Sequence, residues 1–289
     1  MSMRYRFMRF PDNKPKAVTF SYDDGVKQDI RLCDVFNRHG MKGTFNLNSA
    51  FIGQAEGRSK LTAEEIQKYI LDAGHEVAVH GEYHRAPGKQ RAIIGIQDVL
   101  NCRVSLEQMF GRIIRGMAYP DSGVTNFQNG TDYQTVKTYL EQLDIAYSRS
   151  LAGDNNAFQM PQDWHNWIPT IHHNNPNSLA WAEEFVNLPI HPNIGQLFPR
   201  LFYVWGHSYE FDNNDNWDHI EKLCDVLSNR DDIWYATNIE IYDYTQAYNS
   251  LVCSADNTRV YNPTLYTIWF VQDSVSYCVA PGETIVISE

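Results

Sequence analysis

The stretch VTFSYDDGV, residues 18–26, joins an apolar run to two adjacent carboxylates and a glycine. Residues 17–22 have the composition of a short buried strand, and Asp23 and Asp24 follow where that strand ends. In a barrel of parallel strands, catalytic groups collect at the carboxyl ends of the strands. Successive residues at a strand end point in different directions, so one carboxylate can bind a metal while the other faces a substrate. Taken alone, however, Asp-Gly after a strand is also ordinary turn chemistry.

The rest of the chain alternates strand-like runs with helical patterns, which predicts a barrel of parallel strands surrounded by helices. Further strands are expected at 43–47, 76–80, 114–119, 145–148, 201–205 and 233–236. Thr62 and Glu65 have the spacing of a capping box and predict a helix start, and Gly74 is expected to end that helix. A second helical stripe consists of Trp217, Ile220, Leu223, Cys224 and Leu227.

The composition of the chain changes from about Leu251 onward. YTIWFVQ, SVSYCVA and TIVIS are short runs rich in β-forming residues and separated by turn residues. We therefore predict a barrel domain over residues 1–250 and a small β-rich extension over residues 251–289.

Bulk properties narrow the class of protein. The chain has 289 residues, 43% of them hydrophobic, and a net charge of −11. Such a length supports a large core, and the negative charge argues against a nucleic-acid partner. No apolar run has the length of a signal peptide or a membrane span, so we expect a cytoplasmic protein without a membrane partner. The five cysteines lack C-x-x-C spacing, which argues against a cysteine zinc site. The oligomeric state is left open.

EVAVHGEYHRAP, residues 76–87, contains the most specific metal-binding pattern. His80 and His84 lie at the end of a predicted strand with His-x-x-x-His spacing, which lets two imidazoles reach one ion. Together with Asp24 they would form an Asp-His-His site, and three protein ligands leave room for water and substrate. A pair of surface or structural histidines remains the alternative.

Two other segments contain candidate functional groups. His207 follows the apolar strand in LFYVWGHSYEF, where it can exchange a proton near neutral pH or serve as a structural histidine. Asp163 and Trp164 lie in FQMPQDWHNW, where the tryptophan can line a sugar site or simply belong to the core.

In this order, the motifs resemble those of the NodB-homology polysaccharide deacetylases, carbohydrate esterase family 4. The resemblance extends from Ala17 to about Tyr235. SYDDG, residues 21–25, stands where that family has T-F-D-D-G, and HGEYH, residues 80–84, matches the H-[ST]-x-x-H motif at both histidines. The strand that ends in His207 matches the last motif. The resemblance implies a distorted (β/α)7 barrel, followed here by the β-rich extension.

The resemblance also implies roles for the matching residues. Asp23 would be the general base, and His207 the general acid. Asp24, His80 and His84 would bind one divalent ion, with zinc expected first and cobalt, nickel or iron as alternatives.

Five further positions receive roles by the same resemblance. Asp163 would orient or tune a catalytic partner, and Trp164 would line the substrate groove. Tyr119 and Pro120 would contribute to substrate binding, and the backbone N–H of Asp121 would stabilise the oxyanion.

The sequence departs from the family at three motifs, one of which has Met160 in place of its first acidic residue. Gly81 replaces the Ser or Thr whose hydroxyl steadies the metal loop, and Ala118 replaces the arginine expected near the base. We hypothesise that Arg149, at the end of another predicted strand, supplies that charge to Asp23; a surface arginine is the alternative. His172 and His173 are expected to be polar loop residues, although contact with the substrate is also possible in that position.

The leading functional prediction is a metal-dependent hydrolase that removes acetyl groups from an N-acetylated or O-acetylated carbohydrate. A second prediction keeps the fold but changes the substrate to small non-sugar amides or imides. The third is a degenerate homologue that binds carbohydrate without turnover, which the changes at Gly81 and Ala118 would favour.

Overall fold

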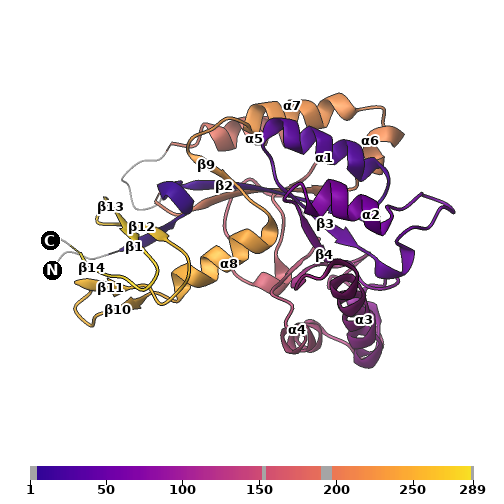
Figure 1. Ribbon diagram of the computed structural model, residues 1–289, viewed down its shortest axis with the longest axis horizontal. Helices are drawn as coiled ribbons and strands as arrows, with labels where there is room; N and C mark the ends of the chain where they lie inside the picture. Colours follow the sequence, from indigo (N-terminus) through magenta and orange to yellow (C-terminus); the bar gives the residue numbers. More distant parts are fainter. Residues whose placement is uncertain (1–4, 152–153, 190–196, 288–289) are drawn as a thin grey trace.

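The computed structural model describes residues 5–151, 154–189 and 197–287, and its centre is an eight-stranded parallel sheet (Figure 1). The strand order is β6-β5-β4-β3-β2-β8-β7, and β9 pairs with the start of β2. The strands are β2 (Lys16–Asp23), β3 (Gly43–Leu47), β4 (Glu76–Val79), β5 (Gly116–Ala118), β6 (Tyr147–Arg149), β7 (Ile171–His172), β8 (Arg200–Gly206) and β9 (Ile233–Tyr235). Each predicted strand is present, with small differences at the ends, whereas the two-residue strand β7 was not predicted.

The two edges of this sheet are joined by the residues that lead into β7. Trp167 N–H donates to Ser148 O of β6 over 3.1 Å, and Ser150 N–H donates to Trp167 O over 3.0 Å. Three residues later, Thr170 N–H donates to Tyr203 O of β8 over 2.8 Å. The segment 167–172 therefore lies between β6 and β8 and links the edges of the curved sheet. The predicted distorted (β/α)7 barrel is confirmed.

Strand β2 lies inside the sheet and pairs with three other strands. All eight of its residues are buried, and it pairs along its length with β8, at its start with β9 and at its end with β3. Its apolar residues Ala17, Val18, Phe20 and Tyr22 are buried in the core, and the buried Thr19 donates its hydroxyl to Asn238 Oδ1 over 2.8 Å. Its last residue is Asp23, so the first carboxylate is positioned by a buried strand that is paired on both edges.

Helices cover the outside of the sheet. The α-helices are α1 (Gln28–His39), α2 (Ala63–Glu65), α3 (Ala92–Phe110), α4 (Tyr133–Gln142), α5 (Ser178–Val186), α6 (Tyr209–Asn213), α7 (Trp217–Leu227) and α8 (Asn238–Asn249). The shorter turns are η1 (Pro11–Asn13), η2 (Ser49–Phe51), η3 (Ile66–Leu71), η4 (Pro87–Lys89) and η5 (Trp164–Asn166). Figure 1 shows α1, α5 and α7 together along one side of the sheet, and α3 beside α4 on another.

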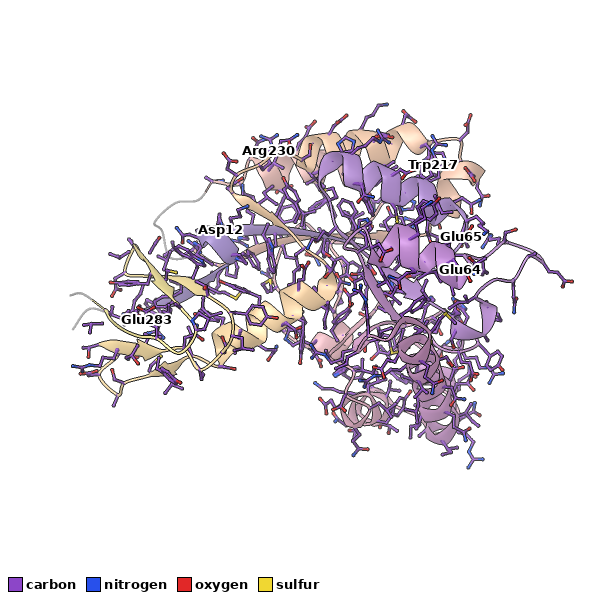
Figure 2. All side chains as sticks on the ribbon, viewed as in Figure 1. Asp12, Glu64, Glu65, Trp217, Arg230 and Glu283 are labelled. Atoms are coloured by element: carbon purple, nitrogen blue, oxygen red, sulfur yellow. The ribbon has the colours of Figure 1, made fainter. Side chains whose placement is uncertain are left out.

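The two helix predictions are confirmed. Thr62 and Glu65 form the capping box at the start of α2, and Figure 2 shows Glu65 in that first turn. The helix continues as the π-helical turn η3. In α7 the predicted stripe is buried from Trp217 to Leu227, against the core that also contains Phe36 of α1.

The C-terminal region is β-rich, as predicted. It contains β10 (Val252–Cys253), β11 (Arg259–Tyr261), β12 (Ile268–Gln272), β13 (Val275–Val279) and β14 (Thr284–Val286) in two three-stranded antiparallel sheets. The N-terminal strand β1 (Arg6–Arg9), which was not predicted, pairs antiparallel with β12. The boundary between residues 250 and 251 stays a prediction, and β1 joins the two ends of the chain in one sheet. In residues 5–151, 154–189 and 197–287, no helix is both long and apolar enough to cross a membrane.

Candidate active site

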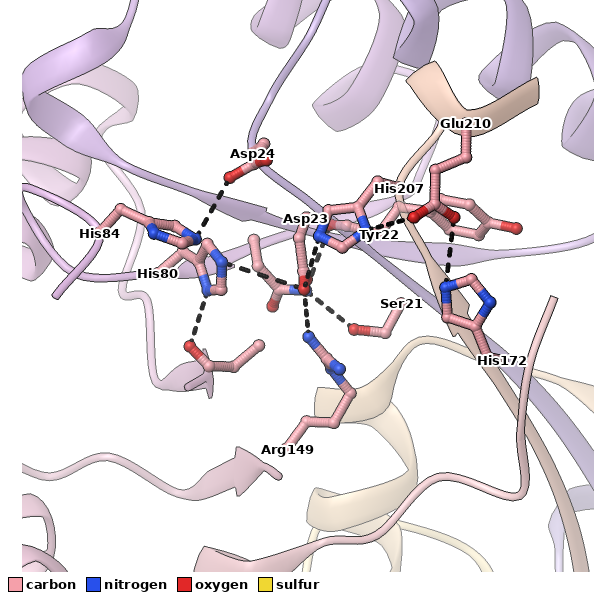
Figure 3. A network of polar contacts seen from close by, with 12 residues as sticks. Ser21, Tyr22, Asp23, Asp24, His80, His84, Arg149, His172, His207 and Glu210 are labelled. Carbon is pink, nitrogen blue, oxygen red and sulfur yellow. Dashed lines mark hydrogen bonds and ion pairs between the residues drawn. The ribbon is translucent and has the colours of Figure 1, made fainter. Parts of the chain in front are cut away.

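Four of the predicted site residues meet at the carboxyl ends of the strands (Figure 3). Asp23 is the last residue of β2 and Arg149 is the last residue of β6. His80 follows β4 directly, and His207 follows β8 directly. Because parallel strands end at the same rim of the barrel, residues far apart in the sequence come together there.

The Asp23 carboxylate is 3% exposed and is contacted on both oxygens. Asn46 Nδ2 donates to Oδ1 over 2.8 Å, and Arg149 Nη2 donates to Oδ2. The Nε2 atoms of His80 and His207 each lie 3.9 Å from Oδ2. Burial alone raises the pKa of Asp23, yet Arg149 and the two nearby histidines hold it below its usual value. The buried carboxylate is therefore ionised near neutral pH and can accept a proton.

Arg149 lies at the place that the hypothesis gave it. Ala118, which stands where the family has its arginine, is the register partner of Arg149 on the neighbouring strand β6. The Arg149 side chain is fully buried, and its guanidinium carbon is 4.6 Å from the ring centroid of Trp205. An arginine on β6, in place of the family's arginine on β5, thus keeps a positive charge beside Asp23.

Asp24, His80 and His84 form a group of possible metal ligands. One donor atom from each lies within 4.8 Å of the others, and Asp24 Oδ1 is 3.6 Å from His84 Nε2. His80 Nδ1–H donates to Ala118 O over 2.9 Å, which leaves the lone pair of Nε2 for an ion. Burial lowers the pKa of His80 to about 4, so its ring is neutral. Two imidazoles and a carboxylate fit a divalent ion of the zinc class.

The backbone is unusual at the same positions. Asp24, His84 and Asp121 have φ angles of 83°, 55° and 52°, in the left-handed region that few non-glycine residues adopt. Asp24 is held there by its own N–H, which donates to Asn46 O over 3.0 Å, and by Lys60 Nζ, which donates to Asp24 O over 2.8 Å. Such conformations gather at functional sites, where the surrounding structure stabilises them.

The loop that carries both histidines is held by Asp98 of α3. The Asp98 carboxylate accepts the N–H groups of Glu82 and Tyr83 over 3.2 and 3.1 Å. Gly81 has a φ of 74°, and a Cβ at this position would lie 2.4 Å from Asp98 Oδ2. The missing hydroxyl at position 81 therefore does not leave the loop unsupported, because a carboxylate from α3 occupies that space. No sequence pattern indicates the role of Asp98, which lies 17 residues beyond Gly81.

His207 has a partner that the sequence analysis did not identify. Its Nδ1–H donates to Oε1 of Glu210 in α6 over 3.2 Å. Burial alone lowers the pKa of His207, yet Glu210 and the nearby aspartates hold it above its usual value. The raised pKa favours the protonated form of the ring, which is the form that a general acid needs. The signal available in the sequence was the spacing of three residues, which places both groups on one helical turn.

Asp163 and Trp164 lie away from this cluster. Asp163 Oδ2 accepts Tyr133 Oη–H over 2.7 Å and Lys137 Nζ over 2.9 Å. The Trp164 ring packs edge-on against Trp167 and Tyr242, with centroids 4.9 and 5.0 Å apart.

Both residues line a cavity of about 660 Å³ that Arg115 and Ala146 also line. These two positions precede β5 and β6, so the cavity lies at the amino ends of the strands, opposite the cluster. By the motif match, Asp163 and Trp164 were expected near the catalytic groups, at the carboxyl ends of the strands.

The segment after β5 lies at the rim of the cluster. Tyr119 is 1% exposed and its hydroxyl donates to His165 O over 2.9 Å, so its side chain belongs to the core. Pro120 is also buried. Asp121 is exposed, and Lys89 Nζ donates to its Oδ2 over 2.9 Å.

Comparison with known proteins places this geometry in context. Residues 11–139 match the family model for polysaccharide deacetylase. No curated protein matches the chain. A provisionally assigned polysaccharide deacetylase from Mycobacterium smegmatis aligns with a TM-score of 0.56 at 16% identity, over 83% of this chain and 93% of that one.

Two other solved structures align less closely. A family 4 acetyl xylan esterase from Clostridium thermocellum, in complex with a cobalt ion, has a TM-score of 0.48 at 13% identity over 80% of this chain and 92% of its own. A CE4 family pseudoenzyme from Bacillus anthracis has a TM-score of 0.46 at 14% identity over 82% of this chain and 68% of its own.

The support of the metal loop by Asp98 leads to a test that separates backbone strain from steric conflict. Gly53 has a φ of 78° with open space around its missing Cβ, whereas Gly81 has a similar φ but faces Asp98. Gly53→Ser should cost about 1–2 kcal/mol of unfolding free energy through strain alone. Gly81→Ser should cost about 1–3 kcal/mol more through overpacking and should weaken zinc binding, although it restores the residue type of the family.

Urea unfolding and zinc titration of the two variants measure these effects. The interpretation is wrong if Gly81→Ser matches Gly53→Ser in stability and binds zinc as tightly as the unmodified chain.

Proposed function

We propose, on the confirmed resemblance to the NodB-homology polysaccharide deacetylases, that this chain is a metal-dependent hydrolase that removes acetyl groups from an acetylated carbohydrate. The observation that supports this most directly is the convergence of a buried carboxylate with a lowered pKa, a candidate metal group and a histidine with a raised pKa at one rim of the barrel. Asp23, His207 and the ligand group come from different strands, and the fold brings them together.

Asp24, His80 and His84 are the residues that would hold one divalent ion. Zinc is the first expectation for this donor set, and cobalt, nickel or iron are the alternatives. When bound, the ion supplies Lewis-acid activation of the scissile carbonyl and of the attacking water.

The protein's own groups then divide the proton transfers. Asp23 accepts a proton from the attacking water as a C–O bond forms at the acetyl carbon. Asn46 holds Oδ1 of Asp23, and Arg149 keeps the carboxylate ionised until it acts. His207 gives its Nε2 proton to the departing nitrogen or oxygen as the acetyl bond breaks, which releases acetate and an amine or alcohol.

The rim segment after β5 has a supporting role in this proposal. The backbone N–H of Asp121 would donate to the oxygen that gains negative charge, and Tyr119 and Pro120 would fix the segment by their burial. The proposal assigns no catalytic role to Asp163 or Trp164, because they line the cavity at the amino ends of the strands.

Two observations favour an enzyme over a non-catalytic homologue. The family arginine is absent at Ala118, but Arg149 contacts the base from the next strand. The hydroxyl is absent at Gly81, but Asp98 accepts two N–H groups of the metal loop. At each departure from the family, another side chain thus contacts the base or the metal loop. The cytoplasmic location and the absence of nucleic-acid and membrane partners stay predictions.

Acetate release from a panel of substrates tests the proposed reaction. The zinc-loaded chain should release acetate from N-acetylated chitooligosaccharides or O-acetylated xylooligosaccharides. A chelator should abolish this release and added zinc should restore it, because the activating ion is required. Turnover of small amides or imides alone would favour the second functional prediction. No turnover of any member, with an intact bound ion, would contradict the proposal.

The role of Arg149 yields a pH prediction. Asp23 acts as a base only when ionised, and Arg149 is a main cause of its lowered pKa. Arg149→Ala leaves the carboxylate buried without its cation, so its pKa should rise and the acidic limb of kcat/KM should move to higher pH. Activity at pH 7 should fall by about 10²-fold or more, the range of general base catalysis.

Arg149→Lys keeps a positive charge and should recover part of this loss. Arg115→Ala is the matched control, since Arg115 precedes β5 and pairs with Asp243 at the amino ends of the strands, opposite the cluster. An unchanged pH profile in Arg149→Ala would exclude the proposed role.

A further inference from the structure

We infer that Glu210 is the residue that orients His207, by accepting its Nδ1–H and so fixing Nε2 as the nitrogen that exchanges a proton at the active site. The inference rests on the proposed hydrolase and deepens it. By resemblance, this orienting role was expected for Asp163, which instead bonds to Tyr133 and Lys137.

The two nitrogens of His207 face opposite partners (Figure 3). Nδ1 lies 3.2 Å from Glu210 Oε1, and Nε2 lies 3.9 Å from Asp23 Oδ2. With Nδ1–H held by a carboxylate, the ring gains or loses its mobile proton only at Nε2. That is the nitrogen nearest the proposed base and therefore the reacting groups.

Glu210 is itself held firmly by the segment after β7. Its Oε2 lies 3.2 Å from His172 Nε2 and 3.0 Å from His173 Nε2, and it accepts Asn174 Nδ2 over 3.1 Å. Asn174 thus hydrogen-bonds to Oε2 and both histidine rings lie against it, which leaves Oε1 for His207. The two histidines that were expected to be polar loop residues thus position the carboxylate.

The ring of His173 packs against two aromatic rings. It is fully buried, with its centroid 5.5 Å from that of Tyr22 and 4.3 Å from that of Phe211, both nearly parallel to it. Tyr22 precedes Asp23 in β2, so the support of Glu210 is packed against the strand that carries the base. A network of this kind restricts the rotation of each member.

The same group has the spacing of a metal site, since donor atoms of His172, His207 and Glu210 lie within 4.8 Å of one another. The hydrogen bonds favour a different interpretation. Asn174 N–H donates to His172 Nδ1 over 3.2 Å, which assigns the ring proton to Nε2. A protonated Nε2, which lies 3.2 Å from Glu210 Oε2, has no lone pair for an ion. The donor pattern is therefore that of a hydrogen-bond network.

The charged and titratable groups around His207 come from several elements. They are Asp23 of β2, Asp24 beyond its end, His172 of β7, His173 after it, and Tyr209 and Glu210 of α6. Among the described residues, Glu210 is the carboxylate hydrogen-bonded to the ring, whereas Asp23 is 3.9 Å away. Loss of the Glu210 charge should therefore make His207 easier to deprotonate.

The proton balance follows from this arrangement. As the bond between the acetyl carbon and the leaving nitrogen or oxygen breaks, Nε2–H of the His207 imidazolium moves to the leaving atom. The ring becomes neutral and keeps its proton on Nδ1, hydrogen-bonded to Glu210. No further proton acceptor is needed for this step.

Ring-nitrogen NMR of the full chain tests the inference without relying on catalysis. The His207 signals are identified by their loss in His207→Gln. In Glu210→Gln, the titration of His207 should move to lower pH, and its neutral form should become a mixture of Nδ1–H and Nε2–H tautomers. Glu210→Asp keeps the charge at a longer reach and should titrate between the two.

Asp212→Asn is the matched control, because it removes one carboxylate from the same short helix, where Asp212 accepts the indole N–H of Trp217. It should leave the His207 titration unchanged. If Glu210→Gln titrates with the midpoint and tautomer of the unmodified chain, the inference is wrong.

Kinetics and metal content complete the test. Glu210→Gln should lower kcat by about 10- to 100-fold with little change in KM, and the alkaline limb of the pH profile should move to lower pH. An inactive unmodified chain would contradict the proposed hydrolase, while the NMR result would still decide the role of Glu210. Zinc titration should give one ion per chain; a second ion that disappears in Glu210→Gln would overturn the inference in favour of a metal site.

Discussion

The site depends on one buried ion pair, between Arg149 at the end of β6 and Asp23 at the end of β2. A carboxylate that is 3% exposed would be costly to keep ionised without a partner, and breaking a buried pair typically costs about 3–5 kcal/mol. The pairing of β5 with β6 brings Arg149 level with Ala118, the position where the family has its arginine. From there, Arg149 contacts Asp23. The pair gives Asp23 a low pKa in a place where burial acts in the opposite direction.

The same rim of the barrel gives neighbouring groups opposite properties. Asp23 still belongs to β2 and is buried, whereas Asp24 turns out of the strand at a φ of 83° and is contacted by His84. His80 has a lowered pKa and is a neutral candidate ligand, whereas His207 has a raised pKa and is a candidate acid. Burial is the main cause of the lowered pKa of His80, whereas at His207 the Glu210 carboxylate and the nearby aspartates outweigh burial.

Sequence patterns predicted the features that depend on local order. The apolar run before Asp23, the Thr62 capping box and the stripe of α7 each lie within one element, so periodicity and capping rules were sufficient. Arg149 could be proposed because it ends a predicted strand, as the base does. The spacing of three residues between His207 and Glu210 was also a signal in the sequence for a contact between them.

Other features could not be predicted, because they arise from contacts between distant segments. Asp98 reaches the metal loop from α3, β1 pairs with a strand about 260 residues later, and β7 is too short for a periodic pattern. The motif match alone was misleading for Asp163 and Trp164, since matching letters do not fix the end of the strand at which they lie.

The central claim is that adjacent aspartates perform different functions, and metal content together with turnover in two isosteric variants tests it most directly. Asp24→Asn removes a candidate ligand, so the purified protein should lose its bound divalent ion and its activity. Asp23→Asn removes the base, so it should keep about one ion per chain, as a single three-ligand site predicts, and lose turnover alone. If both variants keep the ion, or both lose it, the assignment of Asp23 as base and Asp24 as ligand is contradicted.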